Sequence, residues 1–152
     1  MLLLDIDHFK RINDTFGHLA GDHVLTLFSQ AVSAQLRVID CFGRYGGEES
    51  VLLMPQTDLN GATLAAERLR CVIEQTNFDT VQSGTSISVS IGVAEFFDGE
   101  SVAQLIARAD LALYSAKNAG RNKVVTAAPP NPIFDDVGEG DSATTDSLRQ
   151  RR

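Results

Sequence analysis

Residues 40–54 read DCFGRYGGEESVLLM, in which two strand-forming runs flank the pair Gly46-Gly47. A glycine pair between apolar and aromatic runs favours a tight turn, so we predict a β-hairpin. Pro55 ends the second run, because proline has no backbone N–H to donate to a sheet. The hairpin therefore presents two acidic side chains, Glu48 and Glu49, at its tip.

The segment before the hairpin predicts one strand, a loop and one helix. Residues 1–7 are apolar until they turn acidic, as a buried strand does where it reaches the edge of a sheet. Asn13-Asp14 and two glycines predict a loop up to Gly21. Apolar residues at three- and four-residue steps then predict a helix that begins after Asp22.

The segment after the hairpin predicts a helix within 62–73, a strand over 87–93 with small residues on its other face, a helix within 102–113 and a short strand at 124–125. The order β-α-β-β-α-β, with an appended helix and strand, is that of a ferredoxin-like α+β sheet. We expect the helices to cover one face of this sheet.

Composition limits the class of protein and its partners. The chain has 152 residues and a formal net charge of −7, which disfavours binding to nucleic acid through phosphate contacts. No apolar run approaches the ~20 residues that a membrane-spanning helix needs. Met1-Leu2-Leu3-Leu4 runs into Asp5 without a basic leader, and two cysteines form no disulfide framework. We therefore expect no nucleic-acid partner, no membrane contact and a cytoplasmic location.

The composition changes from about Ala127, where three prolines are followed by glycines and a mixture of Ser, Thr and Asp. Such a segment buries too little apolar surface to fold alone. We predict one domain over 1–126 and a flexible tail over 127–152, with Ile133-Phe134 as a weak docking element.

The predicted topology brings acidic groups together. Asp5 and Asp7 share one face of the first strand, and that strand and the hairpin are central neighbours, so Asp5 can face Glu48. Converging carboxylates repel one another unless a cation lies between them, and Mg²⁺ prefers oxygen ligands while keeping room for substrate phosphates. The alternative is that these side chains are solvated acids at strand ends.

The joint pattern of motifs is more specific than any single one. Its blocks are Asp5-Ile6-Asp7-His8-Phe9-Lys10, Asn13-Asp14, Gly17-His18, Gly21-Asp22, Arg44-Tyr45-Gly46-Gly47-Glu48-Glu49, Ala116-Lys117 and Gly120-Arg121-Asn122. With this spacing the chain resembles the GGDEF family of diguanylate cyclases over residues 1–126. The resemblance implies a nucleotide-cyclase palm that binds one GTP, and two such domains that meet as a homodimer to form cyclic di-GMP.

The resemblance also implies roles for individual residues. Asp5, Glu48 and the backbone carbonyl of Ile6 would hold two Mg²⁺ ions per GTP, with Mn²⁺ as an alternative, and Glu49 would be the second catalytic acid of the hairpin. The substrate-binding set comprises Gly46 and Gly47 at the α-phosphate, Lys10, Lys117 and Arg121 at the β- and γ-phosphates, Asn13 and Asp22 at the guanine, and Phe9.

Two alternatives for these residues remain open. Asp22 is also a good N-cap for the helix predicted to follow it. Lys117 and Arg121 also suit the negative C-terminal end of the third helix.

Arg37-x-x-Asp40 precedes Gly46 at the offset of the family's product-inhibition site. The resemblance implies that Arg37 and Asp40 bind the guanine edge or phosphate of cyclic di-GMP. Arg68, on the exposed face of the second helix, is a candidate for a further arginine at that site; a solvated helix charge is the alternative.

The chain departs from the family pattern in three respects. Ser50 stands where the signature has phenylalanine, and losing a large apolar side chain costs ~3–5 kcal/mol unless neighbours refill the space. We also expect the chain to lack the helix and loop that precede the first strand in the family, and a sensory or dimerising module. A non-catalytic receptor of cyclic di-GMP or GTP, and a fragment that folds poorly, are therefore the alternatives to an active cyclase.

Overall fold

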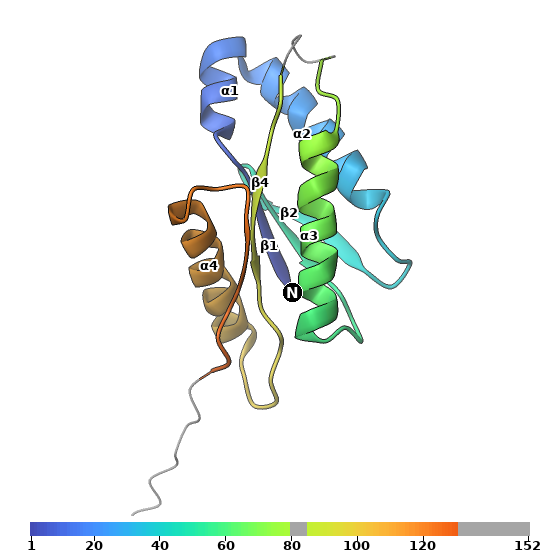
Figure 1. Cartoon of the computed structure of the whole chain (residues 1–152), viewed down its shortest axis with the longest axis vertical. Coiled ribbons are helices and arrows are strands. Elements are labelled where there is room, and N and C mark those ends of the chain that lie inside the picture. The colour runs from blue at the N-terminus through green and yellow to red at the C-terminus, as the bar shows by residue number, and fades with distance from the viewer. Residues whose placement is uncertain (80–84, 131–152) are drawn as a thin grey trace, which may run out of the picture.

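The computed structural model describes residues 1–79 and 85–130. Its centre is a five-stranded sheet in the order β2-β3-β1-β4-β5, in which only the β4–β5 pair is parallel (Figure 1). The strands are β1 (Leu2–Ile6), β2 (Cys41–Gly46), β3 (Glu49–Leu53), β4 (Val89–Val93) and β5 (Val124–Thr126). The helices are α1 (Phe9–Phe16), α2 (His18–Ser33), α3 (Leu59–Gln75) and α4 (Val102–Asn118). The predicted order of strands, and the α+β class, are confirmed.

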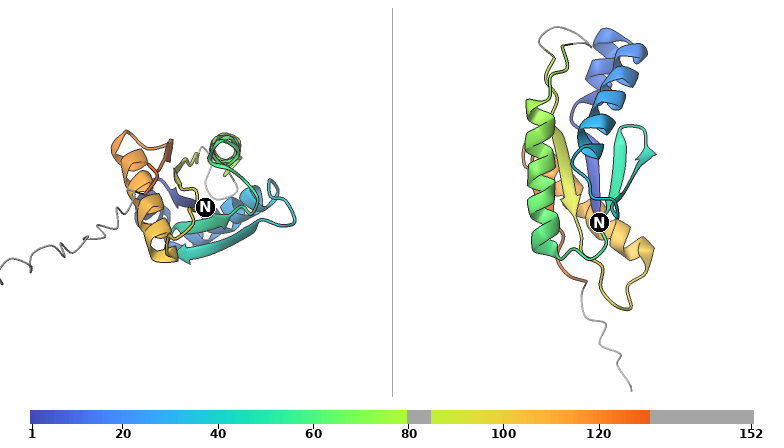
Figure 2. Two further views of the ribbon diagram at one scale, coloured as in Figure 1. Left: turned by 90° about the horizontal axis from the view of Figure 1, so that it is seen from below. Right: turned by 90° about the vertical axis from the view of Figure 1, so that its right-hand side faces the viewer.

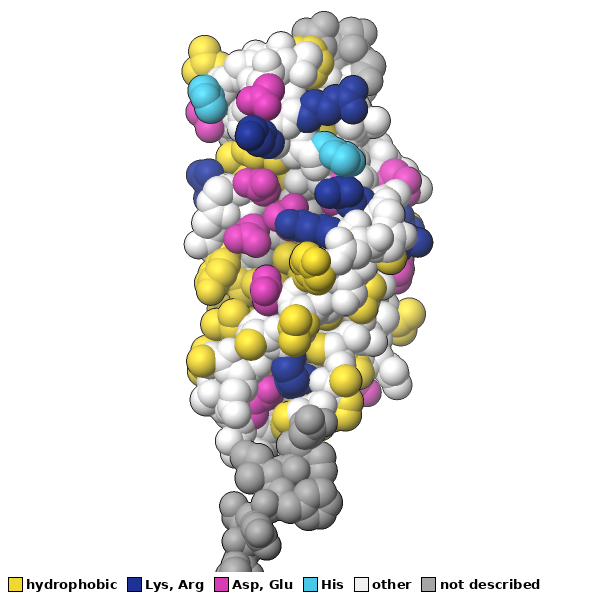
Figure 3. Space-filling model, turned by 90° about the vertical axis from the view of Figure 1, so that its left-hand side faces the viewer, with side chains coloured by type: hydrophobic (Ala, Val, Ile, Leu, Met, Phe, Trp, Pro, Cys, Tyr) yellow, Lys and Arg dark blue, Asp and Glu magenta, His cyan; other side chains and the backbone are white. Residues whose placement is uncertain are grey.

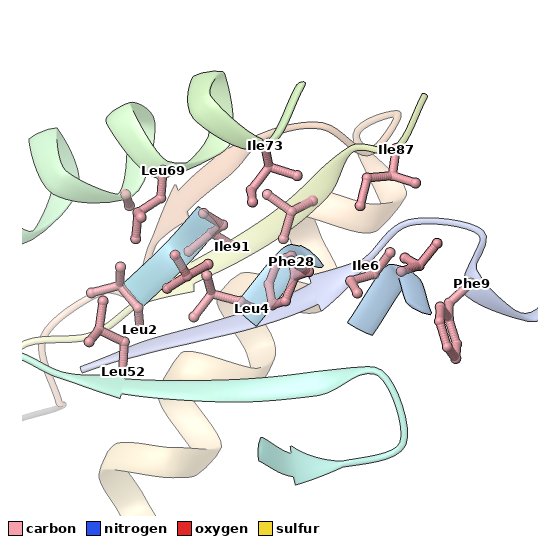
Figure 4. Packing of buried hydrophobic residues seen from close by; sticks show 14 of the residues in the cluster. Leu2, Leu4, Ile6, Phe9, Phe28, Leu52, Leu69, Ile73, Ile87 and Ile91 are labelled. Carbon is pink, nitrogen blue, oxygen red and sulfur yellow. The ribbon is translucent and has the colours of Figure 1, made fainter. Parts of the chain in front are cut away.

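Side chains that alternate along β1 point into two separate cores. Leu2, Leu4 and Ile6 pack with side chains from α2 and α3 in the larger core, which Figure 4 shows around Phe28, Leu69, Ile73 and Ile91. Leu3 points the other way and packs with Leu105, Ala109 and Leu113 of α4. Because all of β1 is buried on both faces, it is an unbroken apolar run up to Asp5.

The prediction that the helices cover one face is correct for α2 and α3 and wrong for α4. Figure 2 shows α3 and α4 on different sides of the sheet. Gly92 of β4 makes the second layer fit, since a Cβ there would collide with the backbone of Ala109 and Leu113. The appended helix therefore completes a three-layer fold rather than extending one helical layer.

The predicted loop between β1 and the first long helix is also wrong. Residues Phe9–Phe16 form α1, which buries Phe9 and Ile12, and α2 begins at His18 instead of after Asp22. Gly17, with φ of 84°, turns the chain between the two helices. Asp22 therefore lies inside α2, and its alternative role as an N-cap is excluded.

The residue that follows β5, Ala127, is still hydrogen-bonded to the sheet. The Ala127 N–H donates to the Val93 carbonyl oxygen at 2.7 Å, and Ala127 packs against the core beneath α4. The carbonyl oxygen of Ala128 accepts a bond of 2.8 Å from Arg108. The rest of the predicted tail, with Ile133-Phe134, lies outside the described residues from 131 onward.

Among the residues that the structure describes, no helix combines the length and the apolar character needed to cross a membrane.

Candidate active site

The centre of the site is where β1 passes the tip of the β2–β3 hairpin. Asp5 lies opposite Glu49 on one side and opposite Ser90 on the other. Glu48 occupies the turn just before β3, which places it beside the same end of β1. The predicted pairing of the first strand with the hairpin is confirmed, and the carboxylates of Asp5, Glu48 and Glu49 interact electrostatically.

Asp5 is a buried carboxylate that is paired with a cation, Lys117. The Lys117 ammonium of α4 donates to its Oδ2 at 2.7 Å. Burial raises the pKa of Asp5 above its ordinary value, Lys117 opposes the shift, and the charges of Glu48 and Asp7 add to it. Lys117 lies in the last turn of α4, where a positive charge is favourable. It also pairs with Asp5 of β1, so the helix end alone does not account for its interactions.

Glu49 lies at the start of β3 and is exposed to the charges of Asp5, Lys117 and Glu48. Partial burial raises the pKa of its carboxyl group, and the neighbouring charge of Asp5 raises it further. Neighbouring carboxyl groups with a perturbed pKa are typical of catalytic and metal-binding sites.

A cleft of about 490 Å³ lies between α1, α2 and the hairpin, and of these three carboxylates Glu48 lines it. It brings together six of the predicted site residues, which are Phe9, Lys10, Asn13, Asp22, Gly47 and Glu48. Figure 3 shows acidic and basic side chains interleaved on the face of the molecule that carries α1 and α4. Gly21 leaves room for the Asn13 side chain, because a Cβ at position 21 would collide with it.

Other predicted residues lie around the cleft without lining it. Gly46 ends β2 beside the turn, and Ile6 ends β1 one residue after Asp5. Arg121 lies on the turn after α4 with an exposed side chain, and within the described part of the chain it forms no ion pair.

Sequence reasoning assigned no role to several residues that contribute to the site. Asp14, His18, Leu25 and Arg44 also line the cleft. The Arg44 guanidinium donates to the Gly47 carbonyl oxygen at 2.8 Å, which braces the hairpin turn. Arg44 immediately precedes Tyr45-Gly46-Gly47 in the motif. This position was the sequence feature that could have indicated its contact with the turn.

Ser50 borders a second hollow of about 470 Å³, whose lining also includes Asp22, Leu25, Thr26, Ser29, Gln30 and Arg44. Its side chain faces the same side of the sheet as Leu4, its register partner, and thus faces α2. Ser50 is itself buried, with 5% of its surface exposed. An underfilled contact between the hairpin and α2, the local consequence expected of the substitution, stays a prediction.

Arg37 and Asp40 form a compact pair outside the cleft. The Arg37 guanidinium donates to Asp40 at 2.9 Å and to the Thr57 hydroxyl at 2.6 Å, and the Arg37 backbone N–H donates to Asp40 at 2.8 Å. The bond from Arg37 lowers the pKa of Asp40, and the charge of Arg68 also lowers it. Arg68 donates to the Gln35 carbonyl oxygen at 3.2 Å, so all three predicted residues lie in one region.

The site residues fit a divalent cation with oxygen ligands, although the described residues contain no group of three or more His, Cys, Asp or Glu side chains arranged for a metal ion. Mg²⁺ needs fewer protein side chains than that, because it is commonly bound by one or two carboxylates together with water and substrate phosphates. Asp5 supplies a buried carboxylate, paired within the described residues with the partly exposed Lys117, and Glu48 supplies a second carboxylate nearby.

The sequence that builds this cleft and this hairpin matches the model of a known family. The family model described as "Diguanylate cyclase, GGDEF domain" matches residues 1–123. The chain belongs to the GGDEF family. The resemblance seen in the sequence is thereby confirmed, and with it the fold.

Relatives and solved structures of GGDEF domains agree with this assignment. The diguanylate cyclase DgcP of Pseudomonas aeruginosa is 45% identical over 127 residues, which cover 84% of this chain and 19% of that protein. The chain thus spans about a fifth of that relative's length.

Two solved structures share the fold at comparable length. The active GGEEF domain of a diguanylate cyclase from Vibrio cholerae has a TM-score of 0.78 and 32% identity, over 85% of this chain and 82% of that one. The coiled coil and GGDEF domain of DgcB from Caulobacter crescentus, in complex with c-di-GMP, has a TM-score of 0.77 and 34% identity, over 83% and 68%.

Proposed function

We propose that residues 1–126 form the catalytic domain of a diguanylate cyclase, which condenses two GTP molecules into cyclic di-GMP. In this reaction the 3′-hydroxyl of each GTP attacks the α-phosphorus of the other. Two P–O bonds form, two pyrophosphates leave, and each hydroxyl loses its proton.

The observation that carries the proposal is the position of Asp5 beside the hairpin turn, whose Gly47 and Glu48 line the cleft. Asp5 lies opposite Glu49 in the sheet, is electrostatically coupled to Glu48, and is held by Lys117. A GTP whose phosphates lie at the hairpin turn would extend into the cleft lined by Lys10, Asn13 and Asp22.

Different residues of the site would bind the guanine and the phosphates of GTP. Asp22 can accept hydrogen bonds from the N1–H and N2–H of guanine, and Asn13 can bond to O6 or N3. Lys10 and Lys117, with Arg121, would neutralise the β- and γ-phosphates. Gly47, which has φ of 53° and no side chain, lets phosphate approach the backbone of the turn.

Asp5, Glu48 and the Ile6 carbonyl would hold Mg²⁺, with Mn²⁺ as a substitute, and Glu49 would assist metal binding or proton transfer. Bound in pairs, such ions activate a 3′-hydroxyl and neutralise charge on the phosphates. The raised pKa of Asp5 and of Glu49 supports this role, because burial disfavours both negative charges and neighbouring carboxylates add to this, and a bound cation would offset both effects.

Catalysis requires two copies of the domain. One cleft holds one GTP, and the attacking hydroxyl must come from a second GTP held on another domain, so we infer a homodimer that forms during turnover. An isolated domain meets its partner only at a rate set by concentration, whereas a linked pair has a high effective concentration.

We further propose that cyclic di-GMP inhibits the enzyme at Arg37, Asp40 and Arg68. Asp40 carries almost no exposed surface in its pair with Arg37, whereas Arg37 is about half exposed. Arg37 is therefore the first group that an incoming product would meet, and Asp40 would become available to guanine only after the pair opens.

Incubation of the protein with GTP and Mg²⁺, followed by chromatography of the nucleotides, tests the activity. The same chain fused to a constitutive dimeriser is the matched control. A cyclic di-GMP peak from the fused protein supports the proposal. Binding of cyclic di-GMP without any synthesis by the fused protein would instead identify a receptor.

A further inference from the structure

The turn between α4 and β5 has a backbone that residues with side chains rarely adopt. Gly120, Arg121 and Asn122 have φ of 108°, 61° and 48° in succession. Left-handed conformations suit glycine and are tolerated by asparagine, but they are disfavoured for arginine. Such a turn persists only where surrounding contacts hold it.

The first of these contacts comes from Asp7, just after β1. Its buried carboxylate accepts bonds from the Ser88 hydroxyl at 2.6 Å, the Ser90 hydroxyl at 2.7 Å and the Asn122 backbone N–H at 3.0 Å. All three donors are neutral, and no cation is paired with Asp7 within the described ranges. Asp7 therefore ties the turn to β1 and β4.

The second contact comes from α3 and involves the Asn122 side chain. Its Oδ1 accepts from Arg70 at 3.0 Å, and its Nδ2 donates to Glu74 at 2.7 Å. Arg70 is itself fixed by ion pairs to Glu67 at 2.9 Å and Glu74 at 3.1 Å. Asn122 is thus held through its backbone by Asp7 and through its side chain by α3.

Arg121 stands directly beside this anchor. Its backbone N–H donates to the Ala116 carbonyl oxygen at 3.1 Å, which closes the end of α4, while its side chain is exposed. The anchored Asn122 and the bond from the Arg121 N–H to Ala116 fix the direction in which the Arg121 side chain leaves the backbone. A cation fixed in this way loses less freedom when it binds an anion.

We propose that Asp7 and Asn122 are positioning residues, which hold the left-handed turn so that Arg121 faces the β- and γ-phosphates of the nucleotide. The inference rests on the proposed function, in which Arg121 binds those phosphates. It assigns Asp7 a role distinct from that of Asp5, although both acids belong to the same short motif.

A double-mutant cycle tests the link between Asn122 and Arg121. Asn122→Gly removes both bonds to α3 but keeps the backbone N–H and tolerates the positive φ. The ligands are 3′-deoxy-GTP, which cannot be joined to a second nucleotide, and 3′-deoxy-GMP, which lacks the β- and γ-phosphates. Both are titrated by calorimetry with Mg²⁺ present.

We expect Asn122→Gly and Arg121→Ala each to weaken 3′-deoxy-GTP binding on the order of ten-fold, the loss of a charge-assisted contact. Neither should change 3′-deoxy-GMP binding, and the double variant should be no weaker than Arg121→Ala. Glu67→Gln, which changes the same ion-pair network without touching Asn122, is the matched control and should bind as the parent does.

Two further variants keep the test decisive. Glu74→Gln weakens only one bond to Asn122 and replaces Asn122→Gly if that variant does not fold. Asp7→Asn leaves one acceptor oxygen for three donors, so we expect faster amide hydrogen exchange at Asn122 and the same selective loss of 3′-deoxy-GTP binding.

Equal losses for both nucleotides, or a double variant weaker by the product of the single effects, would overturn the positioning role. Unchanged 3′-deoxy-GTP binding by Arg121→Ala would overturn both this role and the assignment of Arg121 to phosphate. If the cycle behaves as expected but the dimer-fused protein makes no cyclic di-GMP, the positioning role stands and only the cyclase proposal fails.

Discussion

The Lys117 ammonium of α4 lies 2.7 Å from Oδ2 of Asp5 on β1, across a sequence separation of 112 residues. The bond places a cation beside the carboxylate that we assign to metal binding. Lys117 is partly exposed and Asp5 is not, so the lysine can leave while the carboxylate stays. One side chain can thus neutralise Asp5 when the cleft is empty and contact phosphate when nucleotide is bound.

Replacement of Lys117 by methionine should separate these two roles. Without the ammonium, Asp5 attracts a divalent cation more strongly, so we expect Mn²⁺ binding without nucleotide to tighten several-fold. GTP binding should weaken on the order of ten-fold, because a phosphate contact is lost. Electron paramagnetic resonance of free Mn²⁺ measures the first effect and calorimetry the second. Lys123→Met is the control, and equal Mn²⁺ affinity in all three proteins would argue against competition at Asp5.

The carboxyl groups of the site should make stability depend on pH. Burial raises the pKa of Asp5 and of Glu49 in the folded protein, so the folded state binds more protons than the unfolded state above the ordinary carboxyl range of about 4. The free energy of unfolding should therefore fall as pH rises through that range up to the raised pKa values.

Metal-free unfolding, measured from about pH 4 to about pH 8, tests this dependence. Glu49→Gln should flatten it and raise the melting temperature at neutral pH, because a disfavoured charge is removed. Asp40 acts in the opposite direction, because its pKa is lowered in the folded protein. Its contribution to the free energy of unfolding grows as pH rises, but only at pH values below the ordinary carboxyl range. A melting temperature that rises with pH above about 5 would contradict the expectation.

The hollow beside Ser50 should accept an aromatic ring. Ser50→Phe would bury a large apolar side chain against Leu25 and the hairpin, and we expect stabilisation of about 1–2 kcal/mol, since the hollow is open and partly polar. Thermal melts measure it, and Ser50→Ala separates loss of the hydroxyl from gain of volume. A lower melting temperature for Ser50→Phe alone would mean that the hollow is too tight for the ring.

Arg37→Ala should relieve inhibition by cyclic di-GMP while leaving the initial rate nearly unchanged. The pair with Asp40 lies outside the cleft, so its loss removes a product contact without altering GTP binding. We expect the inhibition constant, measured on the dimer-fused protein, to rise at least ten-fold. Thr57→Val is the control, because it removes the other side-chain partner of Arg37 and keeps the arginine. An inhibition constant equal to that of the parent would show that the site was misassigned.

The order of strands was predictable from sequence because β1 and the hairpin have strong, local patterns. The helix α1 was not, since eight residues with Asn13 and Asp14 in the middle have low intrinsic helix propensity. Its stability comes from burying Phe9 and Ile12, a tertiary effect. The position of α4 on the second face depends on the close approach at Gly92, which no periodicity reveals.

The candidate site was predictable to the extent that its residues belong to contiguous motifs. The hydrogen bonds of Asp7 were not predictable, because its partners come from the segment around β4 and from the turn after α4. The alternating serines of residues 86–90 were the available signal, since small polar side chains on a buried strand need a hydrogen-bond partner.

The central claim is that Asp5 and Glu48 jointly bind a divalent cation together with the triphosphate. Mn²⁺ binding in the presence of 3′-deoxy-GTP, followed by electron paramagnetic resonance, tests it on the parent and on Asp5→Asn and Glu48→Gln. We predict that each variant binds Mn²⁺ at least ten-fold more weakly than the parent while its melting temperature does not fall. Parent-like Mn²⁺ affinity in both variants would contradict the account.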